Sequence, residues 1–140
     1  MKESEIVDMV SRKLTPYILL LGLYLVSFGH LSPGGGFQGG AVLATGIIQL
    51  ALARGVRATT RVFPLRRFSL VETAGFFLFL LIGTVGMLAG LSFLGIFLPT
   101  GTPGRIPSAG FIFFLNLIIG MKVAAGMSLI CLTILKEQGT

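Results

Sequence analysis

Hydrophobic residues gather in four long stretches, at about 16–31, 37–53, 70–91 and 110–135, and the segments between them are rich in glycine, proline or arginine. A helix needs about 20 apolar residues to cross the hydrocarbon core of a bilayer, and each stretch comes close to this length. Because 54% of the residues are hydrophobic and only 11% are charged, too few polar groups remain to cover a soluble globule. The pattern predicts an all-α integral membrane fold with four transmembrane helices, in a single domain over residues 1–140.

Several of these stretches begin or end with known helix signals. Residues 1–13 mix charged and apolar positions, which predicts a short amphipathic helix on the membrane surface. Thr15 followed by Pro16 is a typical N-cap and first-turn pair, so we expect the first span to begin at Pro16. Ser69 and Glu72 have the spacing of a capping box at the start of the third span. The proline- and glycine-rich residues 92–109 predict an irregular external segment.

The segment between the first two spans has the most specific sequence in the chain. From His30 to Gly40 it reads His-Leu-Ser-Pro-Gly-Gly-Gly-Phe-Gln-Gly-Gly. Proline lacks a backbone donor and glycine loses the most backbone freedom in a helix, so this composition predicts a sharp reversal. Two helices joined by so short a connection pack antiparallel. The residues that we assign to this turn are Pro33, Gly34, Gly35, Gly36, Phe37, Gly39 and Gly40.

This turn also carries a family resemblance. Gly29-His30, followed by Pro33-Gly34-Gly35-Gly36-Phe37 and Gly39-Gly40, resembles the signature of the MrpB (MnhB) family, and the four-span layout is similar to that of the family. Its members are small membrane subunits of Mrp-type multisubunit cation/proton antiporters, with related modules in membrane-bound hydrogenases and sulfur reductases. The resemblance implies an accessory subunit that helps to build the ion-translocating region, while larger subunits carry most of the proton pathway.

The net charge of +6 is concentrated on one side of the predicted spans. Arg105 is the basic residue expected on the other side, and Lys122 lies inside the fourth span. The positive-inside rule therefore predicts a multi-pass protein of the cell membrane with both termini in the cytoplasm. No basic surface with interleaved aromatic residues is expected, which argues against nucleic-acid binding. The basic residues on the predicted cytoplasmic side are Lys2, Arg12, Lys13, Arg54, Arg57, Arg61, Arg66, Arg67 and Lys136.

Three ionisable residues are candidates for ion transfer. Lys122 is the strongest, because a charge at mid-membrane costs at least about 2.5–3.5 kcal/mol unless it is compensated. We expect Glu72 to lie near the cytoplasmic interface, several turns away in depth, and therefore expect the counter-charge on another subunit or in water. Snorkelling of Lys122 to an interface is the structural alternative. His30 can relay protons near neutral pH or can hydrogen-bond the carbonyls freed at the turn.

Glycines form stripes on the last two predicted helices. On the third span they share one narrow sector with Glu72, and on the fourth span one of them lies one turn after Lys122. Small residues let neighbouring helices approach closely in membranes. The predicted packing residues are Gly75, Gly83, Gly86, Gly90, Gly120 and Gly126.

The chain lacks the residue patterns of an enzyme. Its one cysteine, Cys131, cannot form an internal disulfide or an iron–sulfur site, and its histidine and acidic residues do not have the spacing of a metal site or a catalytic set. We therefore expect no cofactor and no metal, and a non-catalytic subunit whose partners are other membrane subunits and the lipid bilayer. A purely structural spacer in a membrane-bound redox complex is the alternative hypothesis.

Overall fold

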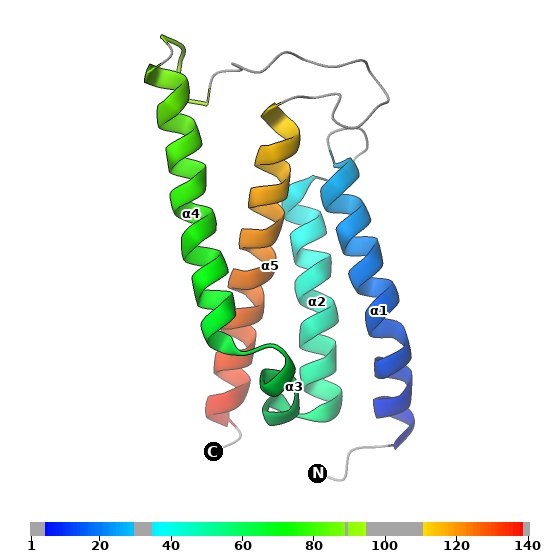
Figure 1. The fold of residues 1–140 in the computed structure, drawn as a ribbon. Coiled ribbons are helices and arrows are strands. Elements are labelled where there is room, and N and C mark those ends of the chain that lie inside the picture. The colour runs from blue at the N-terminus through cyan, green and yellow to red at the C-terminus, as the bar shows by residue number, and fades with distance from the viewer. Residues whose placement is uncertain (1–4, 30–34, 89, 95–110, 139–140) are drawn as a thin grey trace.

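The structure is a computed structural model, and it describes residues 5–29, 35–88, 90–94 and 111–138. These residues form the helices α1 (Glu5–Phe28), α2 (Gly36–Arg54), α3 (Val56–Val62), α4 (Leu65–Leu88) and α5 (Phe111–Gln138) (Figure 1). The two most hydrophobic candidate spans in the described part are in α4 and α5, and α1 and α2 are also long and apolar enough to cross a membrane. The predicted all-α fold with four membrane spans is confirmed.

The four long helices lie side by side in the order α1, α2, α5 and α4 (Figure 1), and α4 has its main contacts with α5. Of the four, α2 is the most buried and α4 the least. Helix α2 can take the central place because several of its buried residues are small, among them Gly39, Gly40 and Ala44. Small side chains let helices on both sides approach its backbone.

Helix α3 is a short connector at the end of the bundle where α1 begins and α5 ends (Figure 1). It lies in the arginine-rich segment between the second and third predicted spans. Its inner side and the start of α4 pack on a small apolar cluster formed by Ile47, Ala51 and Leu132. The residues packed against this cluster include Leu19, Val56, Phe63, Leu65, Phe68 and Leu135.

Helix α1 differs from the prediction at its start. It is continuous from Glu5 to Phe28 and contains Pro16, so residues 5–13 do not form a separate helix, and the helix of the first span does not begin at Pro16. Thr15 does not cap a helix. Its hydroxyl donates a hydrogen bond to the Ser11 carbonyl at 2.7 Å, as in a helix interior. Proline removes only one backbone donor, a loss that membrane helices tolerate where neighbouring groups compensate.

Helix α4 also begins earlier than predicted. It starts at Leu65, directly after Pro64, and the Arg67 amide donates to the Pro64 carbonyl at 2.9 Å. Ser69 and Glu72 therefore lie inside the helix, and the capping-box interpretation was wrong. The motif fits the spacing of a cap, but proline at 64 sets an earlier helix start because it cannot continue a preceding helix.

Gly90 ends α4. Its φ is +80°, the Gly90 amide donates to the Met87 carbonyl, and the Leu91 amide donates to the Gly86 carbonyl. This pattern is a Schellman motif, in which glycine takes the left-handed position after the helix. Among the described residues, nothing lies within 4 Å of the place where a Gly90 Cβ would be, so here Gly90 terminates the helix and contacts no neighbouring helix. The expected irregular segment is described only as far as Leu94.

Candidate functional site

The two charged candidates inside the spans lie together. Lys122 on α5 and Glu72 on α4 form an ion pair, with 3.3 Å between Nζ and Oε1. The side chains are 34% and 37% exposed, respectively, in the isolated chain, so the pair opens on one side of the seam between α4 and α5. The Lys122 ammonium also lies 5.2 Å from the centre of the Phe76 ring, within the range of a cation–π contact.

This pairing overturns the expectation that Glu72 is too far in depth to reach Lys122 and that the counter-charge comes from another subunit. At about 1.5 Å per residue, Glu72 lies about 7–8 Å along α4 from Arg67 and not at the start of the helix. In Figure 1 the C-terminal end of α5 extends beyond the start of α4. This offset brings Lys122 level with the first half of α4. The prediction failed because it placed the start of the third span at 70, whereas α4 begins at Leu65 and Glu72 lies inside it.

Glycines make the close approach at this seam possible. A Cβ on Gly75 would lie 3.3 Å from Lys122 Cβ, and a Cβ on Gly126 would lie 3.6 Å from Glu72 Cγ. Each charged stem therefore packs against a glycine of the opposite helix. In the sequence, Gly75 follows Glu72 by three residues and Gly126 follows Lys122 by four, so each helix presents its charge and its glycine on neighbouring turns of one face.

A groove of about 310 Å³ lies beside the ion pair. Its lining residues are Phe76, Phe79, Ile119, Lys122 and Val123. Apart from the lysine, these side chains are apolar. The site thus combines a carboxylate, which can accept a proton, with a tethered ammonium in an apolar surrounding. Such a pair can hold, release or compensate a positive charge within a membrane span.

The glycine-rich turn is described from Gly35 onward, and His30, Pro33 and Gly34 lie outside the described residues. Gly35 has φ +132°, and its carbonyl accepts a hydrogen bond from the Gly39 amide at 3.1 Å. Phe37 is exposed. This part of the turn lies at the start of α2, whereas the ion pair lies on the α4–α5 seam. The structure therefore does not bring the two together.

The glycines that open α2 lie against neighbouring backbone. A Cβ on Gly36 would collide with the Asn116 carbonyl, and one on Gly39 would lie 2.7 Å from the Val26 amide nitrogen. A Cβ on Gly40 would lie 2.5 Å from the Gly120 carbonyl oxygen. The first turns of α2 thus touch α1 on one side and α5 on the other.

Two glycines of the predicted α4 stripe, Gly83 and Gly86, are buried. The place of a Gly83 Cβ is taken by the ring of Phe93, which comes from the turn after the same helix. On α5, a Gly120 Cβ would meet Val26 of α1. A Cβ at Gly75, Gly83, Gly120 or Gly126 would thus meet a side chain of this chain.

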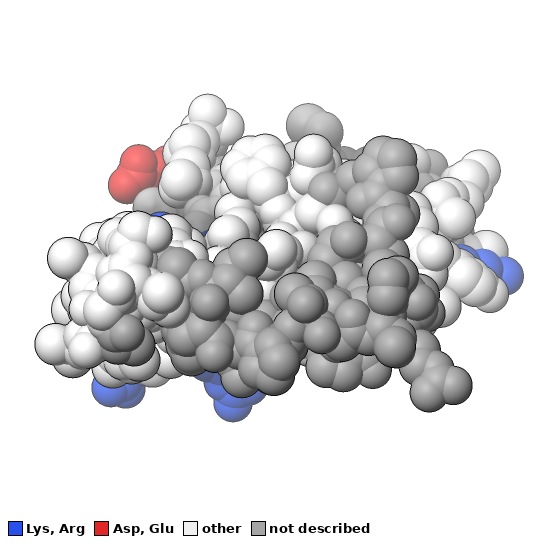
Figure 2. All heavy atoms as spheres, turned by 90° about the horizontal axis from the view of Figure 1, so that it is seen from above, with Lys and Arg blue, Asp and Glu red and all other residues white. Residues whose placement is uncertain are grey.

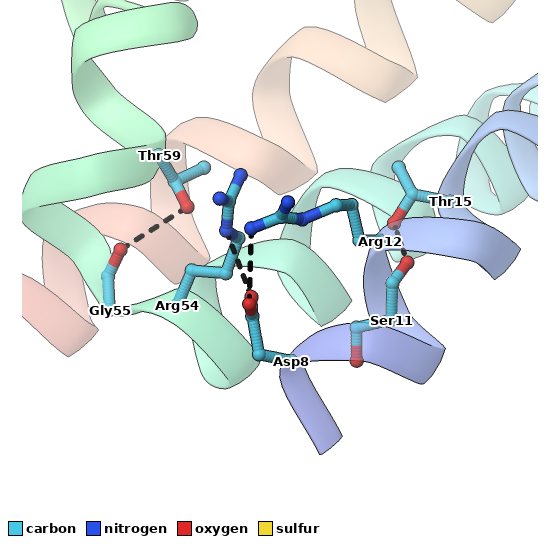
Figure 3. A network of polar contacts seen from close by, with 7 residues as sticks. All are labelled: Asp8, Ser11, Arg12, Thr15, Arg54, Gly55 and Thr59. Atoms are coloured by element: carbon cyan, nitrogen blue, oxygen red, sulfur yellow. Dashed lines mark hydrogen bonds and ion pairs between the residues drawn. The ribbon is translucent and has the colours of Figure 1, made fainter. Parts of the chain in front are cut away.

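A second charged cluster, which the sequence reasoning missed, joins α1 to α2 (Figure 3). Asp8 Oδ1 lies 2.9 Å from Arg54 Nε, and Asp8 Oδ2 lies 3.2 Å from Arg12 Nη2. The pairing of Asp8 with Arg12 has the i, i+4 spacing of a helical ion pair, which was visible in the sequence. The contact with Arg54 depends on the antiparallel packing of α1 and α2.

The fold and the site together define a polytopic membrane protein, with four candidate spans and an ion pair between two of them. Residues 6–129 match the family model described as a domain related to the MnhB subunit of Na+/H+ antiporter. The chain belongs to this family, and the resemblance drawn from the glycine-rich turn is confirmed.

Relatives and a solved structure agree with this assignment. The chain is 34% identical over 94 residues to a Na(+)/H(+) antiporter subunit of Bacillus subtilis, a match that covers 66% of this chain and 65% of that protein. It is 33% identical to an uncharacterized protein of Methanocaldococcus jannaschii, over 88% of this chain. It is similar, with a TM-score of 0.80 and 35% identity over 96% of this chain, to a chain in the structure of the membrane-bound sulfane sulfur reductase, an archaeal respiratory membrane complex.

The matched chains are longer than this one. The chain spans about half of the M. jannaschii protein (49%) and 59% of the chain from the sulfur reductase complex. The similarity in sequence and fold thus covers nearly all of this chain but only part of these two proteins.

Proposed function

We propose that this chain is an accessory membrane subunit of a multisubunit cation/proton antiporter module, and that it helps to form the ion-translocating region and a subunit interface. The family assignment and the similarity to the B. subtilis antiporter protein support the module. The similarity to a chain of a respiratory complex supports the further proposal that such a module works within a membrane-bound redox complex. The other subunits of the assembly carry any redox chemistry.

The main support for a role in ion transfer is the ion pair of Lys122 and Glu72, which lies within two candidate membrane spans. A buried ion pair is weak evidence for stability, because apolar residues of similar volume often stabilise a protein as well or better. Intramembrane charges are costly and are typical of ion pathways. The pair, rather than either residue alone, is therefore the proposed functional unit.

A neighbouring subunit or water completes this site. About a third of each side chain is exposed in the isolated chain, and hydrocarbon cannot solvate the remaining donors of the ammonium or the second carboxylate oxygen. The α4–α5 seam is therefore the proposed subunit interface, and the groove beside Lys122 is the proposed point of contact.

The test compares three variants of the assembled complex in inverted vesicles. Lys122→Met and Glu72→Gln each leave one residue of the pair without its partner, so both should reduce assembly as well as cation-dependent proton movement. The double variant Lys122→Met/Glu72→Gln is uncharged at both positions, so assembly should recover while transport per assembled complex stays low. Normal transport by the double variant would favour the structural spacer and contradict ion transfer through this pair.

The proposed orientation places both termini and α3 in the cytoplasm. The basic residues of α3 and of the adjoining helix ends lie at the end of the bundle that holds both termini (Figure 1), and short cytoplasmic loops carry an excess of Lys and Arg. Ala58→Cys on α3 should react with an impermeant thiol reagent in inverted vesicles but not in intact cells. Thr102→Cys should show the opposite pattern, and reversed labelling of the two would refute the orientation.

A further inference from the structure

Four arginines at the α3 end of the bundle form a basic surface, which we call the arginine platform. Its members are Arg57, Arg61, Arg66 and Arg67, which are all exposed. Between Arg54 and Val71 the sequence contains no acidic residue. Within the described part of the chain these four form no ion pair, whereas Arg12 and Arg54 share Asp8. Among the described residues, no acidic side chain therefore pairs with the arginines of the platform.

The arginine platform has a fixed position on the bundle. Thr59, between Arg57 and Arg61, is only 1% exposed, and its hydroxyl donates to the Gly55 carbonyl at 3.2 Å (Figure 3). Phe63 and Phe68, on either side of the start of α4, stack with 6.3 Å between ring centroids. Both pack on the apolar cluster that contains Ile47. Little conformational freedom is lost when a ligand binds to such a surface, because the backbone that carries the arginines is already ordered.

The arginine platform also lies at the ends of two candidate membrane spans. It follows the end of one span, α2, and includes the first residues of another, α4. Figure 2 views the bundle from the end opposite α3: the described atoms on that face are mostly uncharged, and Lys and Arg side chains are visible only at its outline. Basic groups that point sideways at a span end face the headgroups of the surrounding leaflet.

We propose that the arginine platform binds the phosphate groups of anionic phospholipids in the adjacent leaflet. Guanidinium groups match phosphate oxygens in a two-pronged geometry, and Arg57 and Arg61 lie one turn apart on the same face of α3. Val62, beside Arg61, is 61% exposed, and Ala58, beside Arg57, is also exposed. Apolar side chains between the cations suit the boundary between headgroups and acyl chains, and they would be unfavourable opposite an acidic protein surface.

This binding site is separate from the Lys122–Glu72 pair and does not depend on the proposed function. The probes are photoreactive phosphatidylglycerol and photoreactive phosphatidylcholine, each incorporated into vesicles that contain the assembled complex. After irradiation, labelled peptides are mapped by mass spectrometry. Phosphatidylglycerol should label residues 55–69 more than phosphatidylcholine does, and raised salt should reduce the difference.

Three variants test which charges are responsible. Arg57→Gln/Arg61→Gln should lower phosphatidylglycerol labelling of this segment about 25-fold at low salt, since each cation near the surface contributes about fivefold. Arg57→Lys/Arg61→Lys keeps both charges but loses the two-pronged geometry, so its labelling should lie between that of the parent and that of the glutamine variant. Arg12→Gln is the matched control, because Asp8 already compensates this arginine, and it should change nothing in residues 55–69.

Two results would refute the lipid site. The first is equal labelling by the anionic and the zwitterionic lipid, or labelling that Arg57→Gln/Arg61→Gln leaves unchanged. The second is a cross-link from this segment to an acidic segment of another subunit that excludes lipid, which would make the platform a protein-docking surface. Both readouts are independent of transport, so a failure of the proposed function would leave this inference intact.

Discussion

Lys122 and Glu72 contact each other across the seam of α4 and α5, and each packs its stem against a glycine of the opposite helix. The ion pair therefore depends on two residues that carry no charge. Gly75 and Gly126 keep the helix axes close enough for an Nζ to Oε1 distance of 3.3 Å. A larger side chain at either position would push the two helices apart and so lengthen the distance between Nζ and Oε1.

The first prediction concerns Gly126. Gly126→Leu should separate α5 from α4 and destabilise the chain by about 1–3 kcal/mol, the usual cost of overpacking. Gly126→Ala is the matched control, because the nearest atom to its Cβ would be Glu72 Cγ at an ordinary contact distance of 3.6 Å. Thermal melting of the purified complex and its recovery on native gels measure the effect. Equal behaviour of the two variants would show that the seam tolerates separation.

The second prediction compares two glycines of α2. Gly40→Ala would place its Cβ 2.5 Å from the Gly120 carbonyl oxygen, so the backbone of α5 must move and stability should fall by about 1–3 kcal/mol. Gly46→Ala meets only side-chain atoms of Leu19 and Ile18, at 3.2 Å and more. These can shift, and alanine favours a helix over glycine by about 1 kcal/mol, so Gly46→Ala should stay within about 1 kcal/mol of the parent. A larger loss for Gly46→Ala than for Gly40→Ala, by thermal melting, would contradict the described α2–α5 contact.

The third prediction concerns the Asp8 cluster. Asp8→Asn removes the charge that holds Arg54 and Arg12, so it should loosen the end of α1 from the end of α2. The Asp8 and Arg54 side chains are 29% and 36% exposed, so the loss should be only about 0.5–1 kcal/mol and should decrease at high salt. The measurement is thermal melting at two salt concentrations. The variant Arg54→Gln should cause a similar loss, and the double variant should lose less than the sum of the two.

The fourth prediction concerns Ser128 on α5, which is completely buried and whose hydroxyl oxygen has no hydrogen-bond partner in the described part of the chain. Ser128→Ala removes a buried polar atom without adding volume, so stability should be unchanged or rise by up to about 1 kcal/mol. Ser128→Val, which adds volume at the same place, should destabilise. A clear loss of stability in Ser128→Ala would show that the hydroxyl does have a partner in the assembled complex.

The local features of this protein could be predicted well from its sequence. Four apolar stretches and the reversal before Phe37 predicted the four spanning helices and their family, because hydropathy and backbone restriction act over short distances along the chain. The signals at helix ends were less reliable. Thr15-Pro16 and Ser69-x-x-Glu72 have the form of helix starts, yet both lie inside longer helices whose actual starts are set by the neighbouring sequence and by packing.

The number of spans and the membrane location follow from the sequence alone. The free energy of transferring an apolar side chain into lipid depends on the residue type, and not on which residues lie beside it in the fold. The pairing of Lys122 with Glu72 and of Asp8 with Arg54 was decided by the tertiary structure, because each pair joins residues 46 or more positions apart on antiparallel helices. The relative offset of two helices sets which side chains meet, and this offset results from the packing of glycines against the opposite helix rather than from any local pattern.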